Sequence, residues 1–425
     1  MGWGEAPEGQ SILFYTLSLW EAGIWNNGLL VFAYQMMLIL VLGHVLVLSR
    51  PMEILIHKLA VLVKSPANAA VLVALPTMLV AFFNWGLGLI FGALLARKIG
   101  EHAQANNIPI NYPLVGACGY VGLMVWHGGI SGSAPLKVSE TGHLAELLSQ
   151  GQLQSILDIL PPSISTSETI FSTSNLIIFL TILIVITAFA HFLGSKTKPT
   201  DLHLTLHYFE NSDEKKVEGA ARLNHSRTLS IGFGALILVA FLVQYLPFLQ
   251  KLNITPNLLN FFMLGLAILL HGNFSNFLHA VEKAIGDVSG ILIQFPLYFG
   301  IMGIMSGSGM IGQISDFFVS ISSETTLPIF TFFSAGLVNI FVPSGGGQWA
   351  VQGPLVMESA LALGVPLPKA VMALAYGDQL TNMLQPFWAL PLLGITKLKA
   401  KEILPYSLLF MLVGGVIYLM GLLFF

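Results

Sequence analysis

The chain has 425 residues, of which 55% are hydrophobic and only 9% are charged. Soluble domains carry about 25% charged residues, and apolar runs of about twenty residues recur here, so the composition predicts an all-α membrane protein with many spans. The net charge of −3 provides no basic face for nucleic acid. The single cysteine, Cys118, excludes a disulfide or a thiolate metal site within one chain.

The first part of the chain is predicted to hold one span and one hairpin. A short amphipathic segment at 11–20 precedes the span at 28–49. The next apolar run, 68–97, is interrupted at 83–88 and has Lys or Arg beyond both of its ends. Because cytoplasmic loops are rich in Lys and Arg, both ends of this run are predicted to lie in the cytoplasm. The run therefore enters the membrane and turns back.

A broken crossing helix is predicted after this hairpin. From residue 112 the chain crosses outward through an interruption at 126–135, and a polar loop follows at 137–172. Residues 176–193 return to the cytoplasm, where a basic segment is expected to link two halves. The predicted divisions are a first membrane repeat at 1–194, a cytoplasmic linker at 195–228 and a second membrane repeat at 229–425.

The second half repeats this plan. Spans are predicted at 231–246, 258–271, 291–310 and 403–425, with an amphipathic surface segment at 277–288. The apolar run 327–364 would be about 55 Å long as a single helix, far more than the roughly 30 Å of a bilayer needs. Pro343 and three glycines interrupt it, so two half-length helices are predicted. A broken crossing helix at 370–394, interrupted at 377–386, follows.

The two hairpins are predicted to enter from opposite faces of the membrane. No Lys or Arg lies between Ala284 and Pro368, which places both ends of the second hairpin outside. Of the 18 Lys and Arg, all but Lys137, Lys251 and Lys369 fall on the predicted cytoplasmic side, and the first residues fall outside. Inverted repeats with discontinuous helices are typical of secondary transporters. Such breaks are tolerated only where they line a cavity or are covered by protein, so they predict the binding site.

Four motifs at these breaks resemble those of a known family. They are Asn84-Trp85-Gly86; Trp126-His127-Gly128-Gly129 with Ser131-Gly132-Ser133; Pro343-Ser344-Gly345-Gly346-Gly347-Gln348-Trp349; and Gly377-Asp378-Gln379 with Asn382 and Pro386-Phe387-Trp388. The chain from about Trp20 onward resembles the bacterial short-chain fatty acid transporters, which belong to a wider superfamily of ion-coupled anion carriers.

The resemblance implies several properties of the chain. It implies uptake of butyrate, acetoacetate and similar acids, a place in the bacterial inner membrane, a homodimer, and movement of the hairpin-bearing part against a scaffold. Family members usually begin with one more hydrophobic helix. The sequence leaves open whether a misassigned start codon or a truncated form explains this difference.

The predicted substrate site follows from the charge of a short carboxylate. No Lys or Arg lies near the four interruptions except at membrane boundaries. The restarting half-helices present unpaired N–H groups and a partial positive charge, which suit an anion, and tryptophans such as Trp126 would pack on the acyl tail. The predicted substrate contacts are Asn84, Trp85, Gly86, His127, Ser131, Ser133, Ser344, Gly345, Gly346, Gly347, Gln348, Trp349 and Trp388.

A coupling ion is predicted near Asp378, the only acidic residue in its span. A lone carboxylate at a helix centre costs about 2.5 to 3.5 kcal/mol on insertion scales, which indicates a function. Asp378, Thr381 and Asn382 with unwound carbonyls would hold Na⁺, or Asp378 would carry a proton. His127 is an alternative proton carrier. The structural alternatives are a helix cap for Asp378, a structural histidine for His127, close packing for the glycines and interfacial belts for the tryptophans.

Other function classes remain beside the short-chain carrier. A carrier for another small organic anion, such as a di- or tricarboxylate, has the same predicted fold, and a channel is a more distant alternative. An intramembrane protease would need a second membrane aspartate, or a base near a serine, and the sequence offers neither. The chain is therefore predicted not to be an enzyme, with no cofactor beyond Na⁺ or H⁺ as the coupling ion.

Overall fold

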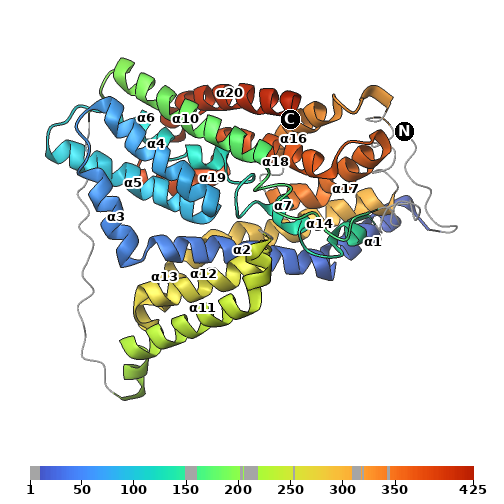
Figure 1. The fold of residues 1–425 in the computed structure, drawn as a ribbon, viewed down its shortest axis with the longest axis horizontal. Coiled ribbons are helices and arrows are strands. Elements are labelled where there is room, and N and C mark those ends of the chain that lie inside the picture. The colour runs from blue at the N-terminus through green and yellow to red at the C-terminus, as the bar shows by residue number, and fades with distance from the viewer. Residues whose placement is uncertain are drawn as a thin grey trace.

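The computed structural model describes residues 10–148, 160–201, 204, 219–251, 254–308, 317, 320–341 and 345–425. Every regular element in these residues is a helix. Figure 1 shows the helices arranged along one long direction, with α1 near one end of the molecule and the end of α10 and the start of α11 near the other. The predicted all-α fold is confirmed.

The first half contains the predicted span, hairpin and broken crossing helix. Its elements are α1 (Ile12–Ile24), α2 (Asn27–Val47), α3 (Arg50–Ala60), α4 (Pro66–Phe83), α5 (Trp85–Ala105), α6 (Tyr112–Cys118), η1 (Val121–Met124), α7 (Ser133–Val138), α8 (His143–Leu148) and α10 (Thr173–Lys196). Several begin at a polar residue whose side chain accepts a bond from the first turn, as Asn26, Ser65 and Ser172 do. These N-caps satisfy amides that have no partner within the helix.

The second half follows the linker. Its elements are η2 (Gly219–Leu223), α11 (Arg227–Gln250), α12 (Pro256–His271), α13 (Phe274–Ala284), η3 (Ile285–Val288), α14 (Ser289–Gly307), α16 (Leu327–Phe341), α17 (Gly345–Leu363), α18 (Leu367–Thr381), η4 (Asn382–Leu384), α19 (Pro386–Thr396) and α20 (Ala400–Phe424). Helix α1 packs against α14, α2 against α12, and α11 against α12. The two halves are therefore joined through their outer helices as well as at the centre.

Two hairpins approach each other inside the molecule. In the first, a single residue with extended backbone, Asn84, separates α4 from α5. In the second, α16 and α17 flank residues 342–344. Figure 1 shows α4 and α5 extending from the left and α16 and α17 from the right, with their tips toward the middle. The first predicted hairpin is thus present with its broken tip, and the second is present as two helices, whose connection at 342–344 lies outside the described residues.

Each crossing helix that follows a hairpin is also broken. Between α6 and α7 lie the short helix η1 and an irregular segment, and between α18 and α19 lies η4. Helix α4 packs against α10 and η1, while α16 packs against α18. Each hairpin therefore lies beside the broken helix of its own half, which brings all four breaks to the centre.

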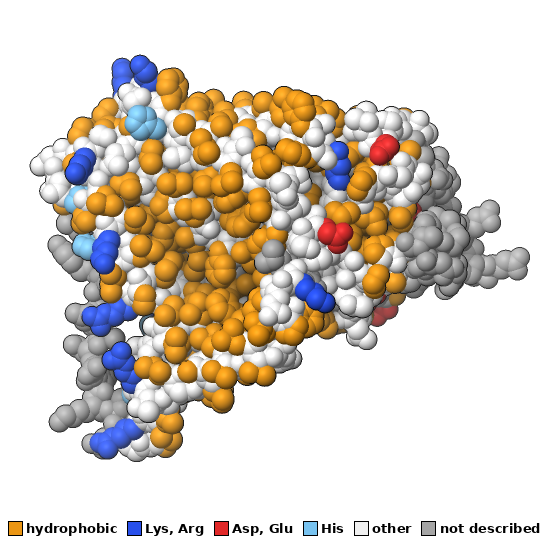
Figure 2. Space-filling view, in the orientation of Figure 1, with side chains coloured by type: hydrophobic (Ala, Val, Ile, Leu, Met, Phe, Trp, Pro, Cys, Tyr) orange, Lys and Arg blue, Asp and Glu red, His pale blue; other side chains and the backbone are white. Residues whose placement is uncertain are grey.

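The surface fits a membrane protein. By length and composition, five helices in the described part of the chain suffice to cross a bilayer: α2, α4, α10, α11 and α20. Figure 2 shows hydrophobic side chains over the middle of one face, with Lys and Arg along the edge where α10 ends and α11 begins. Cytoplasmic orientation of that edge stays a prediction.

Candidate functional site

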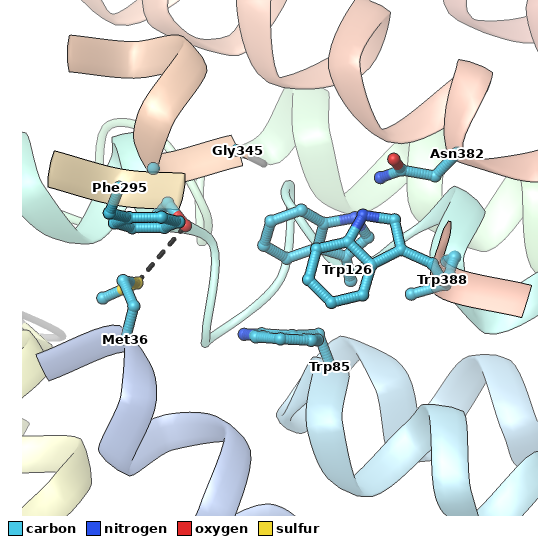
Figure 3. A pocket seen from close by; sticks show the side chains of 10 residues that line it. Met36, Trp85, Trp126, Phe295, Gly345, Asn382 and Trp388 are labelled. Atoms are coloured by element: carbon cyan, nitrogen blue, oxygen red, sulfur yellow. Dashed lines mark hydrogen bonds between the residues drawn. The ribbon is translucent and has the colours of Figure 1, made fainter. Parts of the chain in front are cut away.

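A small cavity lies where the four breaks meet. Trp85 begins α5 at the first tip, and Gly345 and Gly346 begin α17 at the second. The remaining lining residues come from the two broken crossings and from α2 and α14: Met36, Leu123, Trp126, Ser133, Phe295, Asn382 and Trp388. Figure 3 shows these side chains converging on one space. The two hairpin tips therefore share a pocket, and none of the described residues in its wall is charged.

Three tryptophans form one wall of this cavity. The Trp85 ring lies 5.6 Å from Trp126 and 5.1 Å from Trp388, measured between ring centroids. Trp85 and Trp126 are each only 5% exposed, and neither indole nitrogen has a hydrogen-bond partner in the described residues. In Figure 3 the nitrogen end of Trp85 is directed toward the space that Met36 and Phe295 border.

These indole groups are chemically unusual. An indole N–H only donates, and leaving a buried donor unpaired costs about 1 to 3 kcal/mol. Two such donors, on two residues that line one apolar cavity, are therefore suited to a ligand that brings acceptor oxygens. The sequence analysis assigned these rings to the acyl tail and did not foresee their N–H groups as donors.

The second tip needs glycine for close packing. A Cβ on Gly345 would lie 2.6 Å from a carbon of Trp126 and 2.8 Å from Cε1 of His127. A Cβ on Gly346 would lie 2.8 Å from Cζ of Phe32. The start of α17 is thus bare backbone at the cavity wall, and the positive end of a 19-residue helix faces it.

The first tip is held by its own side chains. Oδ1 of Asn84 accepts from the Leu87 amide at 2.7 Å, and Oγ of Ser131 accepts from the Trp85 amide at 2.9 Å. Gly86 packs against Leu40 of α2. Asn84 and Ser131, predicted to contact substrate, are fully buried and do not line the cavity. In this structure they satisfy amides of α5 and fix its position.

The irregular segment between η1 and α7 is clamped from α18. Oε1 of Gln379 accepts from the amides of His127 and Gly128, at 2.8 and 2.9 Å. Its Nε2 donates to the Tyr418 hydroxyl at 2.8 Å. From the other side, the Ile130 amide donates to the Phe82 carbonyl at 2.7 Å. Gln379 is therefore a structural element of the site that the sequence analysis quoted in a motif but gave no role.

His127 and Asp378, predicted as separate ion-coupling candidates, form a pair. Nδ1 of His127 lies 2.5 Å from Oδ2 of Asp378, and both side chains are fully buried. The His127 ring stacks on Trp126 at 4.5 Å between centroids. The pair thus lies directly behind the cavity wall. Oδ1 of Asp378 has no hydrogen-bond partner in the described residues.

The predicted Thr381 and Asn382 lie at the C-terminal end of α18, beside the backbone carbonyl of Asp378. Nδ2 of Asn339 is 2.9 Å from the Asp378 carbonyl oxygen, from Thr381 Oγ1 and from Asn382 Oδ1. Of these residues, only Asn382 also lines the cavity. Asn339 of α16 thus bridges to the end of α18.

Several other predicted contacts lie away from the cavity. Trp349 donates its indole N–H to Nε2 of His143 at 3.0 Å, and Gln348 donates to the Ala335 carbonyl at 2.8 Å. Gly347 is buried in α17 but does not line the cavity. Ser344 lies outside the described residues. Ser133 and Trp388 do line it; the Ser133 hydroxyl contacts the Met36 sulfur at 3.4 Å, a weak acceptor.

The sequence analysis missed three lining residues. Met36, Leu123 and Phe295 are apolar residues within apolar helices, so no local pattern distinguishes them from residues that face lipid. A basic residue also lies closer than expected. Lys137 at the end of α7 is buried, 5.6 Å from the centroid of the Phe32 ring, and is paired with Glu140. Its charge is thus neutralised locally, one side-chain layer behind Gly346.

Comparison with known proteins places this site in context. A sequence model described as short chain fatty acid transporter matches residues 9–425. A protein of Escherichia coli strain K12 that carries the name of a short-chain fatty acid transporter is 37% identical over 416 residues, which are 96% of this chain and 90% of that protein. A protein of Haemophilus influenzae with the same name is 36% identical over 415 residues, with the same coverage of both chains.

A solved structure has the same overall fold. The crystal structure of the YdaH transporter of Alcanivorax borkumensis, described as having an unusual topology, superposes with a TM-score of 0.55. The alignment covers 98% of this chain and 90% of that one, at 15% sequence identity. At this identity the likeness shows the fold alone.

Proposed function

Because this chain belongs to the short-chain fatty acid transporter family, a family of carriers and not of enzymes, we propose that it takes up short-chain monocarboxylates such as butyrate and acetoacetate through the cavity between its hairpin tips. Uptake is coupled to Na⁺ or H⁺. The two buried, unpaired indole N–H groups of Trp85 and Trp126 carry this proposal.

The carboxylate is proposed to bind among the donors of the cavity. Hydrogen bonds to a charged group contribute about 1.5 to 3 kcal/mol each, and the indole N–H groups have no competing partner in the described chain. Gly345 and Gly346 add the backbone at the positive end of α17, and Ser133 adds a hydroxyl. Together these donors would stabilise one negative charge without a cationic side chain.

The acyl tail is proposed to pack against the apolar remainder of the wall. Leu123 and Phe295 have no hydrogen-bonding group, and Met36 has only a sulfur that accepts weakly, so none of the three can donate to a carboxylate. A second carboxylate in that region would be a buried charge without a partner, which is strongly unfavourable. These features favour a monocarboxylate over a di- or tricarboxylate.

The wider arrangement gives further proposals. The hairpin-bearing part moves against a scaffold made by the outer helices, so the site is opened to each side in turn. The protein resides in the bacterial inner membrane with the linker at 195–228 in the cytoplasm, and it forms a homodimer. These proposals rest on the family resemblance and on the basic edge of the surface.

Transport assays in proteoliposomes test the function. Labelled butyrate is expected to accumulate above equilibrium when a Na⁺ or proton gradient is imposed, with saturable kinetics. Unlabelled acetoacetate should compete, whereas succinate and citrate should not. Strong competition by succinate or citrate would assign the site to another anion class. Flux that never saturates and cannot exceed equilibrium would indicate a channel.

A further inference from the structure

We infer that the coupling ion is a proton and that it binds to Oδ1 of Asp378, while His127 is held in one tautomer as its positioning partner. The inference rests on the proposed function, because it requires a carboxylate in the adjacent cavity. It differs from a proton on the histidine and from Na⁺ coupling, which the sequence left open.

The tautomer of His127 follows from its two hydrogen bonds. The amide of Ala134, in the first turn of α7, donates to Nε2 of His127 at 3.0 Å. An amide N–H is only a donor, so Nε2 must accept and carry no proton. The ring proton is therefore on Nδ1, where it is donated to Oδ2 of Asp378 at 2.5 Å. A further proton on Nε2 would oppose the Ala134 N–H and break this contact.

The free oxygen of the carboxylate is then the available proton acceptor. Oδ1 of Asp378 is buried, and no group in the described residues donates to it. With His127 neutral and Asp378 ionised, the pair carries one negative charge, and within the described residues one side-chain hydrogen bond, from His127, reaches the carboxylate. A proton on Oδ1 removes this charge and leaves the His127 and Ala134 bonds intact.

The pair lies close enough to the cavity to respond to the substrate. The ring of Trp126, which stacks on His127, is the layer between the pair and the cavity. Cε1 of His127 also lies against the backbone of Gly345. A carboxylate bound at these residues puts a second negative charge beside the first in a medium of low dielectric constant. Anion binding and proton binding on Asp378 therefore favour each other, as linkage requires.

The chemical step is simple proton binding. A proton from one aqueous side adds to the ionised Asp378 carboxylate and gives the neutral acid, and no bond of the substrate forms or breaks. The proton leaves on the other side with the substrate anion. Each cycle thus moves one anion and one proton, and the net charge moved is zero.

Three titratable groups on the helices around the pair are already engaged with other partners. Titratable side chains on α18 and the helices that pack on it, α7, α16, α17 and α20, are Lys137, Glu358, Lys369, Tyr376, Lys401, Glu402, Tyr406 and Tyr418. Tyr376 donates to Asn175 and Tyr418 to the Met124 carbonyl, at 2.9 and 2.6 Å. Lys137 is paired with Glu140. Among these groups, none is seen to contact Oδ1 of Asp378.

The arrangement of oxygen atoms near Asp378 favours proton coupling over Na⁺ coupling. A hard cation requires several oxygen ligands. Among the described residues, three oxygens near Asp378 all contact the amide nitrogen of Asn339: the Asp378 carbonyl oxygen, Thr381 Oγ1 and Asn382 Oδ1. These oxygens already accept from an amide donor, whereas Oδ1 of Asp378 has no partner in the described residues.

Proton uptake on ligand binding tests the inference. Purified protein in Na⁺-free, weakly buffered solution at pH 7.5 is mixed with potassium butyrate, which is already ionised. A pH dye measures proton uptake and tryptophan fluorescence measures binding. We expect about one proton per bound butyrate, and a dissociation constant that rises about tenfold per pH unit at high pH.

Two variants separate the two members of the pair. In Asp378→Asn, butyrate should still bind but proton uptake should vanish. In His127→Gln, the amide can donate to Asp378 and accept from Ala134 without titrating, so proton uptake per bound butyrate should persist with weaker affinity. Glu324→Gln, at an exposed loop position, is the matched control and should behave as the original chain.

Each other result has a distinct meaning. Proton uptake that survives Asp378→Asn and is lost in His127→Gln would assign the proton to the histidine and overturn the inference. Butyrate binding without proton uptake, or affinity that rises with Na⁺, would overturn it in favour of Na⁺. Absence of butyrate binding to the original chain would refute the proposed function itself. If a variant fails to fold, proton uptake and Na⁺ dependence in the original chain still separate proton coupling from Na⁺ coupling, and binding without proton uptake would still overturn the inference.

Discussion

Replacing Trp126 by Phe removes one indole N–H from the cavity and keeps an aromatic ring behind it. In our account this N–H donates to the carboxylate, and a hydrogen bond to a charged group contributes about 1.5 to 3 kcal/mol. Since each 1.4 kcal/mol is a factor of ten, the dissociation constant for butyrate should rise about 10- to 100-fold. Trp85→Phe should act in the same direction. Fluorescence titration and competition against labelled butyrate measure both effects.

Two controls separate the lost N–H from the smaller ring. Butyramide has the shape of butyrate but no charge, so the loss of ring area should weaken both ligands, and the loss of the N–H should weaken butyrate more. Trp25→Phe alters an exposed tryptophan, 64% accessible, outside the cavity and should leave the affinity unchanged. Equal losses for butyrate and butyramide, or no loss in either cavity variant, would refute the assignment of the indoles as anion donors.

Three further predictions follow from particular contacts. Asn84→Ala leaves the buried Leu87 amide without its cap, so the unfolding free energy should fall by about 1 to 3 kcal/mol and the melting temperature in detergent should fall with it. An unchanged melting temperature would show that the cap is dispensable. Gly346→Val places a side chain against Phe32 and should abolish butyrate binding while protein is still made; normal affinity would remove the second tip from the site. His225→Cys, before α11, should resist an impermeant thiol reagent in whole cells, since the native Cys118 is buried; labelling from outside would invert the predicted orientation.

Much of the fold could be predicted because the breaks are visible in the sequence. Asn84 lies within the predicted interruption 83–88, and the second tip lies at the predicted Pro and Gly run. Apolar length and the absence of Lys and Arg around the second hairpin were sufficient to infer two turning helices. Helix ends were less accessible: α5 continues to Ala105, beyond the predicted run, because Arg97 and Glu101 pair within the helix and are buried there.

The site was predicted in outline but not in its contacts. Asn84 and Ser131 look like substrate donors in the sequence, yet a polar side chain beside a helix start serves equally well as a partner for the backbone. His127 and Asp378 are 251 residues apart, and nothing local indicates that they pair. Met36 and Phe295 carry no local signal, since cavity-facing and lipid-facing apolar residues look alike.

The most direct test of the account is a structure of the protein with a bromine-labelled short-chain acid, such as 4-bromobutyrate. The account predicts one anomalous peak inside the cavity, with the carboxylate within hydrogen-bond reach of the Trp85 and Trp126 indoles and of the Gly345–Gly346 backbone. A peak elsewhere in the molecule, or a cavity that stays empty while the acid is bound, would contradict it.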